Sequence, residues 1–226
     1  MIADRTPISR VTRTKEQAKE SYNRLSKFYE ALAGGSERPT LDRGLEILDV
    51  QGGEKILEIG YGPGKSMVEM AKRVGESGKV YGIDISEGML EVAQNNVRNA
   101  GLSSRTVLRL GDATHLSFDE NTFDGIFMGF VLELFDTPDI PVVLGECRRV
   151  LKDGGRICVV SLFKQDSPKF PERVYEWSHK QFPILIDCRP IHVRDALEKA
   201  GFEIAESEMG SMWGLKVEIV LTKESK

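Results

Sequence analysis

Two stretches near the start of the chain carry apolar side chains at helical spacing. From Ala18 to Leu32 they recur at three- and four-residue steps, and a pair of glycines ends the pattern. Residues 40–50 repeat this spacing in a second expected helix. Residues 15–50 therefore predict an N-terminal helical cap, preceded by a loose arm over residues 1–14.

Beyond residue 54 the pattern changes to short apolar runs that alternate with amphipathic stretches. The runs are rich in β-forming residues, which is typical of buried strands. Expected strands occupy residues 55–60, 79–85, 106–110, 123–130 and 156–163. Ser86 is an expected N-cap, and the helix before the fifth strand is expected to stop at Lys152–Gly155. Strands that alternate with helices predict a parallel sheet covered on both faces.

The end of the chain breaks this alternation. After a short expected helix at Val193–Ala200, residues 202–208 and 215–222 have strand patterns joined by a loop at 210–214. Two neighbouring strands without a crossover helix pair antiparallel. The sequence therefore predicts an α/β fold, a doubly wound seven-stranded sheet that is mostly parallel and finishes in an antiparallel hairpin.

We expect one domain over residues 1–226, with a cofactor-binding core at 52–163 and a C-terminal helix and hairpin at 192–226. Residues 164–191 stand apart because they combine several prolines with apolar and aromatic side chains. This composition predicts either a lid or pocket wall for an acceptor, or an ordinary surface helix at the sheet edge.

Composition and charge narrow the class of protein. The chain has a net charge of −4 and three cysteines without C-x-x-C spacing. We therefore expect no nucleic-acid partner, no metal and no disulfide framework. Free thiols are typical of the reducing cytoplasm, which is the expected location. The apolar runs are too short for an integral membrane segment, and no secretory signal is expected. The expected partner is a small molecule, and the oligomeric state stays open.

The sequence EIGYGPGKS, residues 58–66, poses the main chemical question. A phosphate-binding P-loop would need a glycine where Ile59 stands. A dinucleotide-binding turn would need a third glycine at Lys65 or Met67, depending on the register. The remaining pattern is E-x-G-x-G-x-G at the carboxyl end of a strand. There, small residues let a ligand lie against the backbone, and the next helix favours an anionic group such as a carboxylate.

Acidic residues are expected at the ends of three successive strands. Glu58 precedes the glycine loop, Asp84 ends the second strand and Asp112 follows the third. Ligands bind at this edge of such sheets, where Asp84 could hold ribose hydroxyls and Asp112–Ala113 could meet the edge of a base. Each acid alone is typical of a solvated loop or a helix cap, but together with the glycine loop the three favour a binding site.

Five sequence blocks, taken in order and spacing, carry a resemblance to a known family. They are ILEIGYGPG (56–64), VYGIDIS (80–86), GDATHLSF (111–118), FDGIFMGFVLELF (123–135) and LKDGGRICVVSLF (151–163). With them the chain resembles the class I S-adenosylmethionine-dependent methyltransferases, from about Tyr22 to its end. It looks most similar to the branch that contains the menaquinone and ubiquinone biosynthesis C-methyltransferases. The resemblance implies S-adenosyl-L-methionine as cofactor and methyl transfer as the reaction.

The resemblance also implies how the cofactor lies. The glycine loop would line its methionine half, the acid after the second strand would bind the ribose, and the loop after the third strand would contact the adenine. The residues implied at the cofactor are Tyr29, Glu58, Gly60, Tyr61, Gly62, Gly64, Asp84, Ile85, Met89, Asp112, Ala113, Met128 and Phe130. Tyr22 is a second candidate, beside Tyr29, for the ring that closes over the cofactor.

The chain departs from the quinone enzymes after the fourth strand. Those enzymes usually carry a polar segment with arginine and asparagine there, whereas residues 130–135 of this chain read FVLELF. We expect a small, hydrophobic acceptor, with C-methylation of a quinone or isoprenoid-ring precursor as the leading interpretation. The residues expected to meet the acceptor are Phe130, Trp177, Phe182, Arg189 and Trp213. Arg189 could clamp an anionic acceptor, or it could pair with Asp187.

Two residues are candidates for a general base, which is needed only if the attacking group starts protonated. His179 lies beside Trp177 in the inserted segment, and Glu133 stands among apolar residues that would raise its pKa if it is buried. Other interpretations stay open. They are N- or O-methylation of a lipid amine or a polar metabolite, a non-catalytic cofactor-binding protein, and an NAD-dependent oxidoreductase, which the glycine spacing disfavours.

Overall fold

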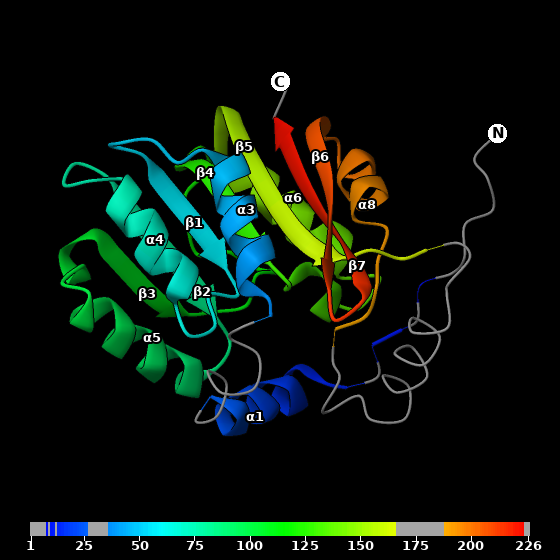
Figure 1. Cartoon of the computed structure of the whole chain (residues 1–226), viewed down its shortest axis with the longest axis horizontal. Coiled ribbons are helices and arrows are strands. Elements are labelled where there is room, and N and C mark those ends of the chain that lie inside the picture. Colours follow the sequence, from blue (N-terminus) through cyan, green and yellow to red (C-terminus); the bar gives the residue numbers. More distant parts are fainter. Residues whose placement is uncertain (1–7, 9, 12, 27–35, 166–187, 224–226) are drawn as a thin grey trace.

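The structure is a computed structural model that describes residues 8, 10–11, 13–26, 36–165 and 188–223. Its centre is one seven-stranded sheet in the order β3-β2-β1-β4-β5-β7-β6 (Figure 1). The strands are β1 Lys55–Ile59, β2 Lys79–Asp84, β3 Thr106–Leu110, β4 Phe123–Gly129, β5 Leu151–Leu162, β6 Glu203–Met212 and β7 Leu215–Lys223. Strands β1 to β5 pair in parallel, and β7 lies antiparallel between β5 and β6. The predicted fold class is confirmed.

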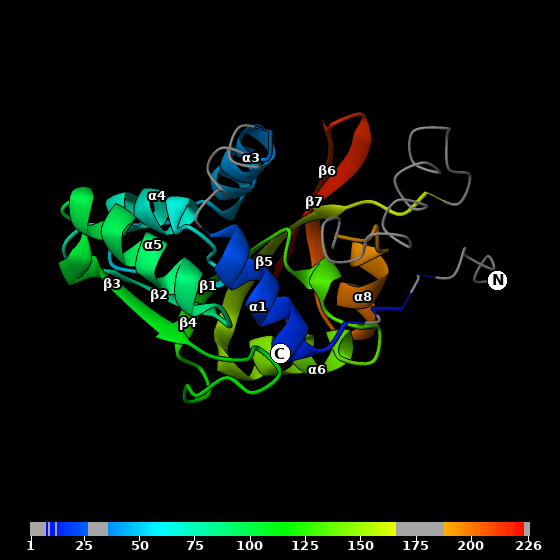
Figure 2. The same ribbon diagram turned by 90° about the horizontal axis from the view of Figure 1, so that it is seen from below.

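Helices cover both faces of the sheet. They are α1 Lys15–Leu25, α3 Arg38–Leu48, α4 Lys65–Arg73, α5 Glu87–Asn99, α6 Ile140–Val150 and α8 Val193–Lys199. Helices α3, α4 and α5 pack on one face, whereas α6 and α8 pack on the other (Figure 2). The central strands are buried on both faces, so their sequences are nearly continuous apolar runs, as parallel sheets require. Among the described residues no helix is long and apolar enough to span a membrane.

One predicted boundary was wrong in an informative way. The fifth strand begins at Leu151, directly after α6, and not at Arg156. The stretch Lys152–Gly155 looks like a helix stop, but the two glycines lie inside the strand. Gly154 has a φ of 73°, and the pairing of β4 with β5 shifts register at this place. Glycine in a strand often marks such an irregularity, which sequence spacing alone does not separate from a helix end.

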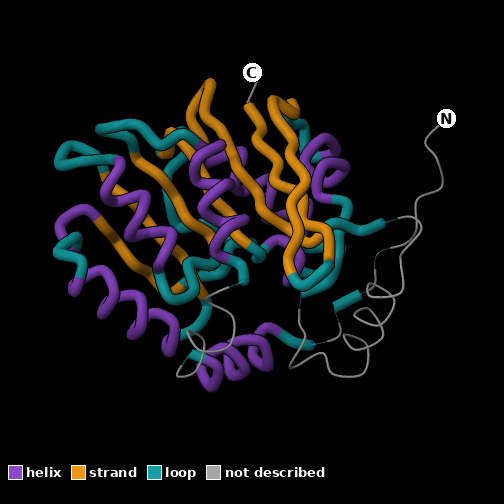
Figure 3. Tube along the Cα trace, in the orientation of Figure 1, coloured by secondary structure: helices purple, strands orange, loops and turns teal. Residues whose placement is uncertain are grey.

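The C-terminal hairpin is tighter than predicted. The expected loop over residues 210–214 is a two-residue turn of Trp213 and Gly214, with φ values of 52° and 79°. Positive φ at both central residues is the geometry whose twist matches the flanking strands. Figure 3 shows the two strands running to this turn as the edge of the continuous sheet.

Helix α1 differs from the other helices because it packs on no face of the sheet. Its N-terminus carries a capping box, in which Thr14 and Gln17 each bind the other's backbone N–H. No residue of this helix is buried. It lies across the edge where the parallel strands end (Figure 2). The part of the predicted first helix beyond residue 26 lies outside the described residues.

Candidate cofactor site at the carboxyl edge of the sheet

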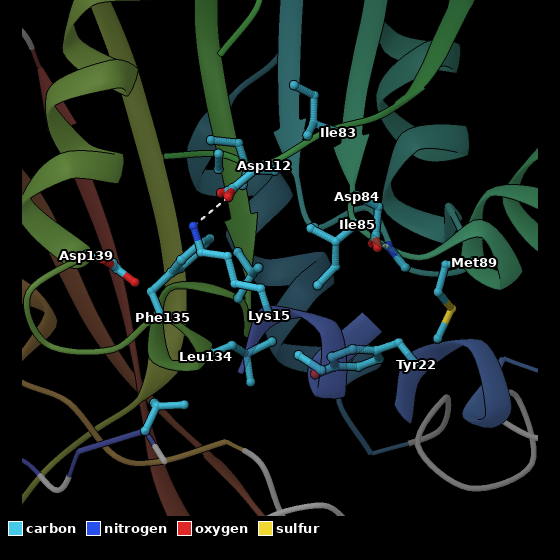
Figure 4. Close-up of a pocket in the computed structure, with 18 of the residues that line it drawn as sticks. Lys15, Tyr22, Ile83, Asp84, Ile85, Met89, Asp112, Leu134, Phe135 and Asp139 are labelled. Atoms are coloured by element: carbon cyan, nitrogen blue, oxygen red, sulfur yellow. Dashed lines mark hydrogen bonds and ion pairs between the residues drawn. The ribbon is translucent and has the colours of Figure 1, made fainter. Parts of the chain in front are cut away.

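A cavity opens where β1, β2, β3 and β4 end (Figure 4). The glycine loop and the ends of β2 and β3 form one part of its wall. Helix α1 and the segment after β4 form the rest. The residues predicted at the cofactor that line it are Gly60, Gly62, Asp84, Ile85, Met89, Asp112, Ala113 and Phe130. The fold therefore gathers residues from four loops at the edge that the sequence indicates.

The glycine loop takes backbone conformations that favour glycine. Gly60, Gly62 and Gly64 have φ values of 69°, 50° and 77°. A Cβ on Gly60 would lie 2.4 Å from Cγ2 of Val131, so this glycine lets the loop approach the segment after β4. A Cβ on Gly64 would meet that of Ala93 in α5 at 2.9 Å. Gly64 thus serves the packing of α4 against α5 and lines neither cavity of the site.

Asp84 is anchored by the backbone. Its Oδ2 accepts a hydrogen bond from the N–H of Gly62 and its Oδ1 accepts one from the N–H of Ser86, each at 2.9 Å. Burial raises the pKa of Asp84, and the backbone hydrogen bonds oppose this shift. Each carboxylate oxygen can accept a further hydrogen bond. The side chain is therefore held in place with acceptor capacity left for a ligand.

Glu58 lies deeper, beneath the glycine loop. Its side chain is buried, and its Oε2 has no hydrogen-bond partner among the described residues. Burial raises the pKa of Glu58 well above its usual range, and the nearby charge of Asp84 raises it further. A buried carboxyl group without a partner is costly, so a cationic ligand group at this place would relieve it.

A second, smaller cavity lies on the other side of the glycine loop. Glu58 and Tyr61 line it, together with Arg38 and Leu41 from α3. Gly60, Gly62 and Gly129 line both cavities. A long ligand can therefore cross the glycine loop, with one end near Asp84 and the other near Glu58. Tyr61 is fixed by its hydroxyl, which donates to the carbonyl oxygen of Arg109 at 3.4 Å.

Helix α1 and the residues before it contribute a wall that the sequence only partly indicates. Arg13, Thr14, Lys15, Ala18 and Tyr22 all line the larger cavity. The guanidinium of Arg13 lies 5.6 Å from the ring centroid of Tyr22, which is a cation–π distance. Tyr22 is a predicted candidate for the cofactor site. No signal in the sequence identifies the basic residues Arg13 and Lys15, because their contacts join residues far apart in the chain.

The end of the cavity farthest from Asp84 is more apolar. Leu134 and Phe135 line it, and Asp139 lies at its limit (Figure 4), while Phe130 and Val131 line the cavity between this end and the glycine loop. Phe130 has a φ of 53°, a conformation that bulky residues rarely adopt and that clusters at functional sites. The pattern FVLELF therefore supplies an apolar wall directly after the fourth strand.

Besides Gly64, four predicted site residues lie away from both cavities. Met128 is buried in the core beneath α6, and Trp213 is 60% exposed at the hairpin turn. Arg189 is buried and donates to the carbonyl oxygen of Phe135 at 2.5 Å. It thus braces the segment after β4 from behind. The predicted clamp on an acceptor stays a prediction.

Glu133 is the fourth of these residues. Its Oε1 accepts a hydrogen bond from the N–H of Leu162 at 3.2 Å, on the side away from the cavity. Burial raises its pKa to about 8, in the direction expected for a buried Glu133. Its predicted role as a base stays untested. Tyr29, Trp177, His179 and Phe182 lie outside the described residues.

Known proteins are similar to this chain over most of its length. A family profile described as a methyltransferase domain matches residues 56–155. The chain is 40% identical to the demethylmenaquinone methyltransferase of Bacillus cereus (strain ATCC 10987 / NRS 248), over 70% of this chain and 74% of that enzyme. The chain matches a smaller part of several other curated relatives, between 42% and 66% of the length of each.

Solved structures share the fold. A crystal structure of a SAM dependent methyltransferase from Aquifex aeolicus has a TM-score of 0.60 at 26% identity, covering 81% of this chain and 88% of that one. The [4+2]-cyclase SpnF has a TM-score of 0.76 at 20% identity, covering 97% and 99%. At that identity the likeness shows the fold alone, and a fold can carry different reactions.

Proposed function

The chain belongs to the class I S-adenosylmethionine-dependent methyltransferases, in the branch that includes demethylmenaquinone methyltransferase, and from this membership we propose that it methylates a small, hydrophobic acceptor. The leading acceptor is a quinone or isoprenoid-ring precursor that is methylated on carbon. When bound, the cofactor supplies a methyl group on a positively charged sulfur, which is already activated for transfer. The chain's own residues then have to bind, align and exclude water.

The observation that carries the proposal is the pair of cavities that meet at the glycine loop. In this proposal the adenosine half of the cofactor occupies the larger cavity, where Asp84 accepts hydrogen bonds from the ribose hydroxyls. The methionine half crosses Gly60 and Gly62 into the smaller cavity. There the carboxyl of Glu58 faces the amino group, and Arg38 and the N-terminus of α4 face the carboxylate.

The apolar end of the larger cavity supports the choice of acceptor. Phe130, Val131, Leu134 and Phe135 offer a surface that fits a ring or an isoprenoid chain better than a polar metabolite. Holding such an acceptor beside the methyl group aligns the reacting atoms, and alignment of this kind can lower the activation barrier by roughly 7–11 kcal/mol in favourable cases. With α1 across the cavity, water is excluded from the reacting atoms.

A base is needed only for an acceptor that must lose a proton. Two carboxylates line the apolar end, and Arg10 pairs with one of them, Asp136. Asp139 is the other, and it has no side-chain hydrogen bond with another described residue in this structure. In Figure 4 it lies beside Phe135 at the far end of the cavity. We therefore place Asp139, beside the earlier candidates Glu133 and His179, among the groups that could orient or deprotonate an acceptor hydroxyl.

Calorimetric titration with S-adenosyl-L-methionine tests the cofactor placement. Asp84→Asn should lower the affinity by roughly 10- to 100-fold, since it replaces a charged acceptor of two ribose hydroxyls. Asp119→Asn, an exposed acid in the loop before β4, is the matched control and should bind as the unchanged protein does. Equal affinities for both variants would contradict the placement.

The acceptor is tested with methyl-labelled cofactor, the purified protein and an extract of the source cells. Protein-dependent label in the organic phase would support a quinol or lipid acceptor, which mass spectrometry can then identify. Label in the aqueous phase alone would contradict the hydrophobic acceptor and favour a polar metabolite. Tight cofactor binding without any transfer would contradict the catalytic proposal.

A further inference from the structure

Three basic side chains near the N-terminus reach three acids on three different loops. Arg10 pairs with Asp136 after β4, Lys15 with Asp112 after β3, and Lys19 with Glu87 at the start of α5. Each of these loops follows a strand that ends at the cofactor cavity. We call residues 10–11 and 13–26 the strap. Its charged contacts therefore cover the edge of the sheet on which the proposed function depends.

Burial adds a smaller contribution within the described residues: the ring of Tyr22 packs half-buried against the core, and Ser26 is buried. None of the residues of α1 is buried, and the three pairs are largely exposed to solvent. Such pairs contribute little to stability and are screened by salt. Asn23 adds hydrogen bonds, because its Oδ1 accepts from the hydroxyl of Ser86 at 2.7 Å and from the N–H of Gly88 at 3.0 Å. A segment with this kind of attachment detaches at low cost in free energy.

The middle pair touches the cavity directly. The Lys15 ammonium lies 2.5 Å from Oδ2 of Asp112, and Figure 4 shows this contact between Asp84 on one side and Asp139 on the other. The other oxygen of Asp112 accepts from the N–H of Thr114 at 2.9 Å. Asp112 is the carboxylate predicted to meet the base of the cofactor. The Lys15 ammonium therefore occupies the carboxylate to which an incoming adenine amine would donate.

We propose that the strap is a gate over the cofactor cavity and that the Lys15–Asp112 pair is its latch. The latch is closed in the ligand-free chain, and the adenine group of the cofactor takes the place of the Lys15 ammonium on Asp112. This inference rests on the proposed function, because it concerns access to the same site. It assigns Lys15 a role in the rate of cofactor binding that does not depend on the acceptor.

The test measures association and dissociation of S-adenosyl-L-homocysteine with the immobilised full chain by surface plasmon resonance. In Lys15→Met the association rate constant should rise roughly two- to fivefold, because an exposed ion pair no longer has to break. Raising the salt concentration should accelerate association to the unchanged chain and do so less in the variant. The matched control is Lys72→Met, which removes the exposed Lys72–Glu69 pair on α4.

A second measurement needs no ligand. Amide hydrogen exchange of residues 13–26 should be faster in Lys15→Met than in Lys72→Met. In the unchanged chain, binding of S-adenosyl-L-homocysteine should change the exchange rate of these residues. Equal association rates and equal exchange in the two variants would overturn the gate and leave the proposed function intact. Failure of the unchanged chain to bind the ligand at all would overturn both.

Discussion

We call Glu58, the glycine loop at residues 60–64 and Asp84 the floor of the cavity. The floor and the loops that the strap contacts both carry carboxylates, but the pKa values of the two sets shift in opposite directions. Burial raises the pKa values of the floor acids Glu58 and Asp84. On the strap side, the hydrogen bond from Lys19 lowers the pKa of Glu87 to about 2. Burial pushes the pKa of Asp112 upward, but hydrogen bonds from Lys15 and Thr114 outweigh it and lower the pKa.

This difference separates two ways of building one site. The floor places acids where the surrounding core, not a charge partner, fixes them, and the fold tolerates the cost of their burial. The strap is held by surface pairs, which contribute little to stability and are screened by salt. In the proposed gate, a fixed floor keeps the cofactor geometry constant, and a more loosely held strap lets the ligand enter. The predictions below separate the two regions by stability, pH and salt.

The largest expected effect comes from adding one methyl group to the floor. In Gly60→Ala the new Cβ would lie 2.4 Å from Cγ2 of Val131, at a φ of 69°. The left-handed conformation and the overpacking together should lower the free energy of unfolding by about 2–4 kcal/mol. Urea denaturation at pH 7 measures this change, and titration with S-adenosyl-L-methionine should show weaker binding.

The control for this variant is Gly62→Ala. Gly62 has a φ of 50°, but a Cβ there would meet nothing within 4 Å. Its cost should be confined to the backbone, about 1–2 kcal/mol. If the two variants were equally stable, the contact with Val131 would not be what requires glycine at position 60.

The next effect concerns the buried acid behind the cavity. Glu133 has a pKa raised to about 8 by burial, so the folded chain holds a proton that the unfolded chain has released above its usual pKa of about 4.5. Stability should therefore fall as pH rises from about 4.5 to about 8, by at most about 1.4 kcal/mol per pH unit. In Glu133→Gln this part of the pH dependence should disappear.

Denaturant unfolding of the two proteins at intervals from pH 5 to pH 8 checks this prediction. Their difference in free energy of unfolding should change with pH in the direction that favours the variant at pH 8. A difference that stays constant over this range would mean that Glu133 is ionised in the folded chain. The variant also reports on catalysis, because a base role would show as lost turnover with unchanged cofactor affinity.

The sequence predicts the floor far better than the strap, for a physical reason. The strand ends, the glycine loop and the acids after each strand follow from short-range patterns, and the sheet then brings them together. The apolar neighbours of Glu133 leave open whether its side chain is buried or points outward, and only the structure shows it buried. The pair of Lys15 with Asp112 has no such local signal, because its members lie 97 residues apart and meet only once the sheet exists.

Errors in the predicted fold have the same origin. Gly154 and Gly155 are locally typical of a helix end, and only the pairing of β5 with β4 shows that they lie inside a strand. The sequence likewise gives no sign of the contact between Arg189 and the carbonyl oxygen of Phe135, which depends on the tertiary fold, and the clamp predicted for Arg189 stays a prediction. Residue type gives the available chemistry, and the packing decides which way the side chain faces.

A smaller effect is expected at the strap. Asp136→Asn weakens the contact with Arg10, whose guanidinium binds both carboxylate oxygens at 2.9 Å. The unfolding midpoint should barely change, because the pair is exposed, while amide exchange in residues 13–26 should accelerate roughly two- to fivefold. High salt should reduce the gap between the variant and the unchanged chain. Asp119→Asn is the control, and a large loss of stability in Asp136→Asn would show that the strap belongs to the folded core.

The last prediction is that the attachment of the strap does not change between pH 8 and pH 5. Over the same range the stability of the fold should change through Glu133, so this comparison distinguishes the two regions most directly. Glu87 has a pKa lowered to about 2, so its contact with Lys19 is fully present above about pH 4.5 and is lost only as pH falls toward 2. Lowering the pH from 8 to 5 should therefore stabilise the fold through Glu133 and leave the strap attached as before. Amide exchange at both pH values, corrected for intrinsic rates, measures both regions in one experiment. Faster opening of residues 13–26 at pH 5 would mean that a group with a higher pKa helps to hold the strap, in addition to the three surface pairs and the hydrogen bonds of Asn23.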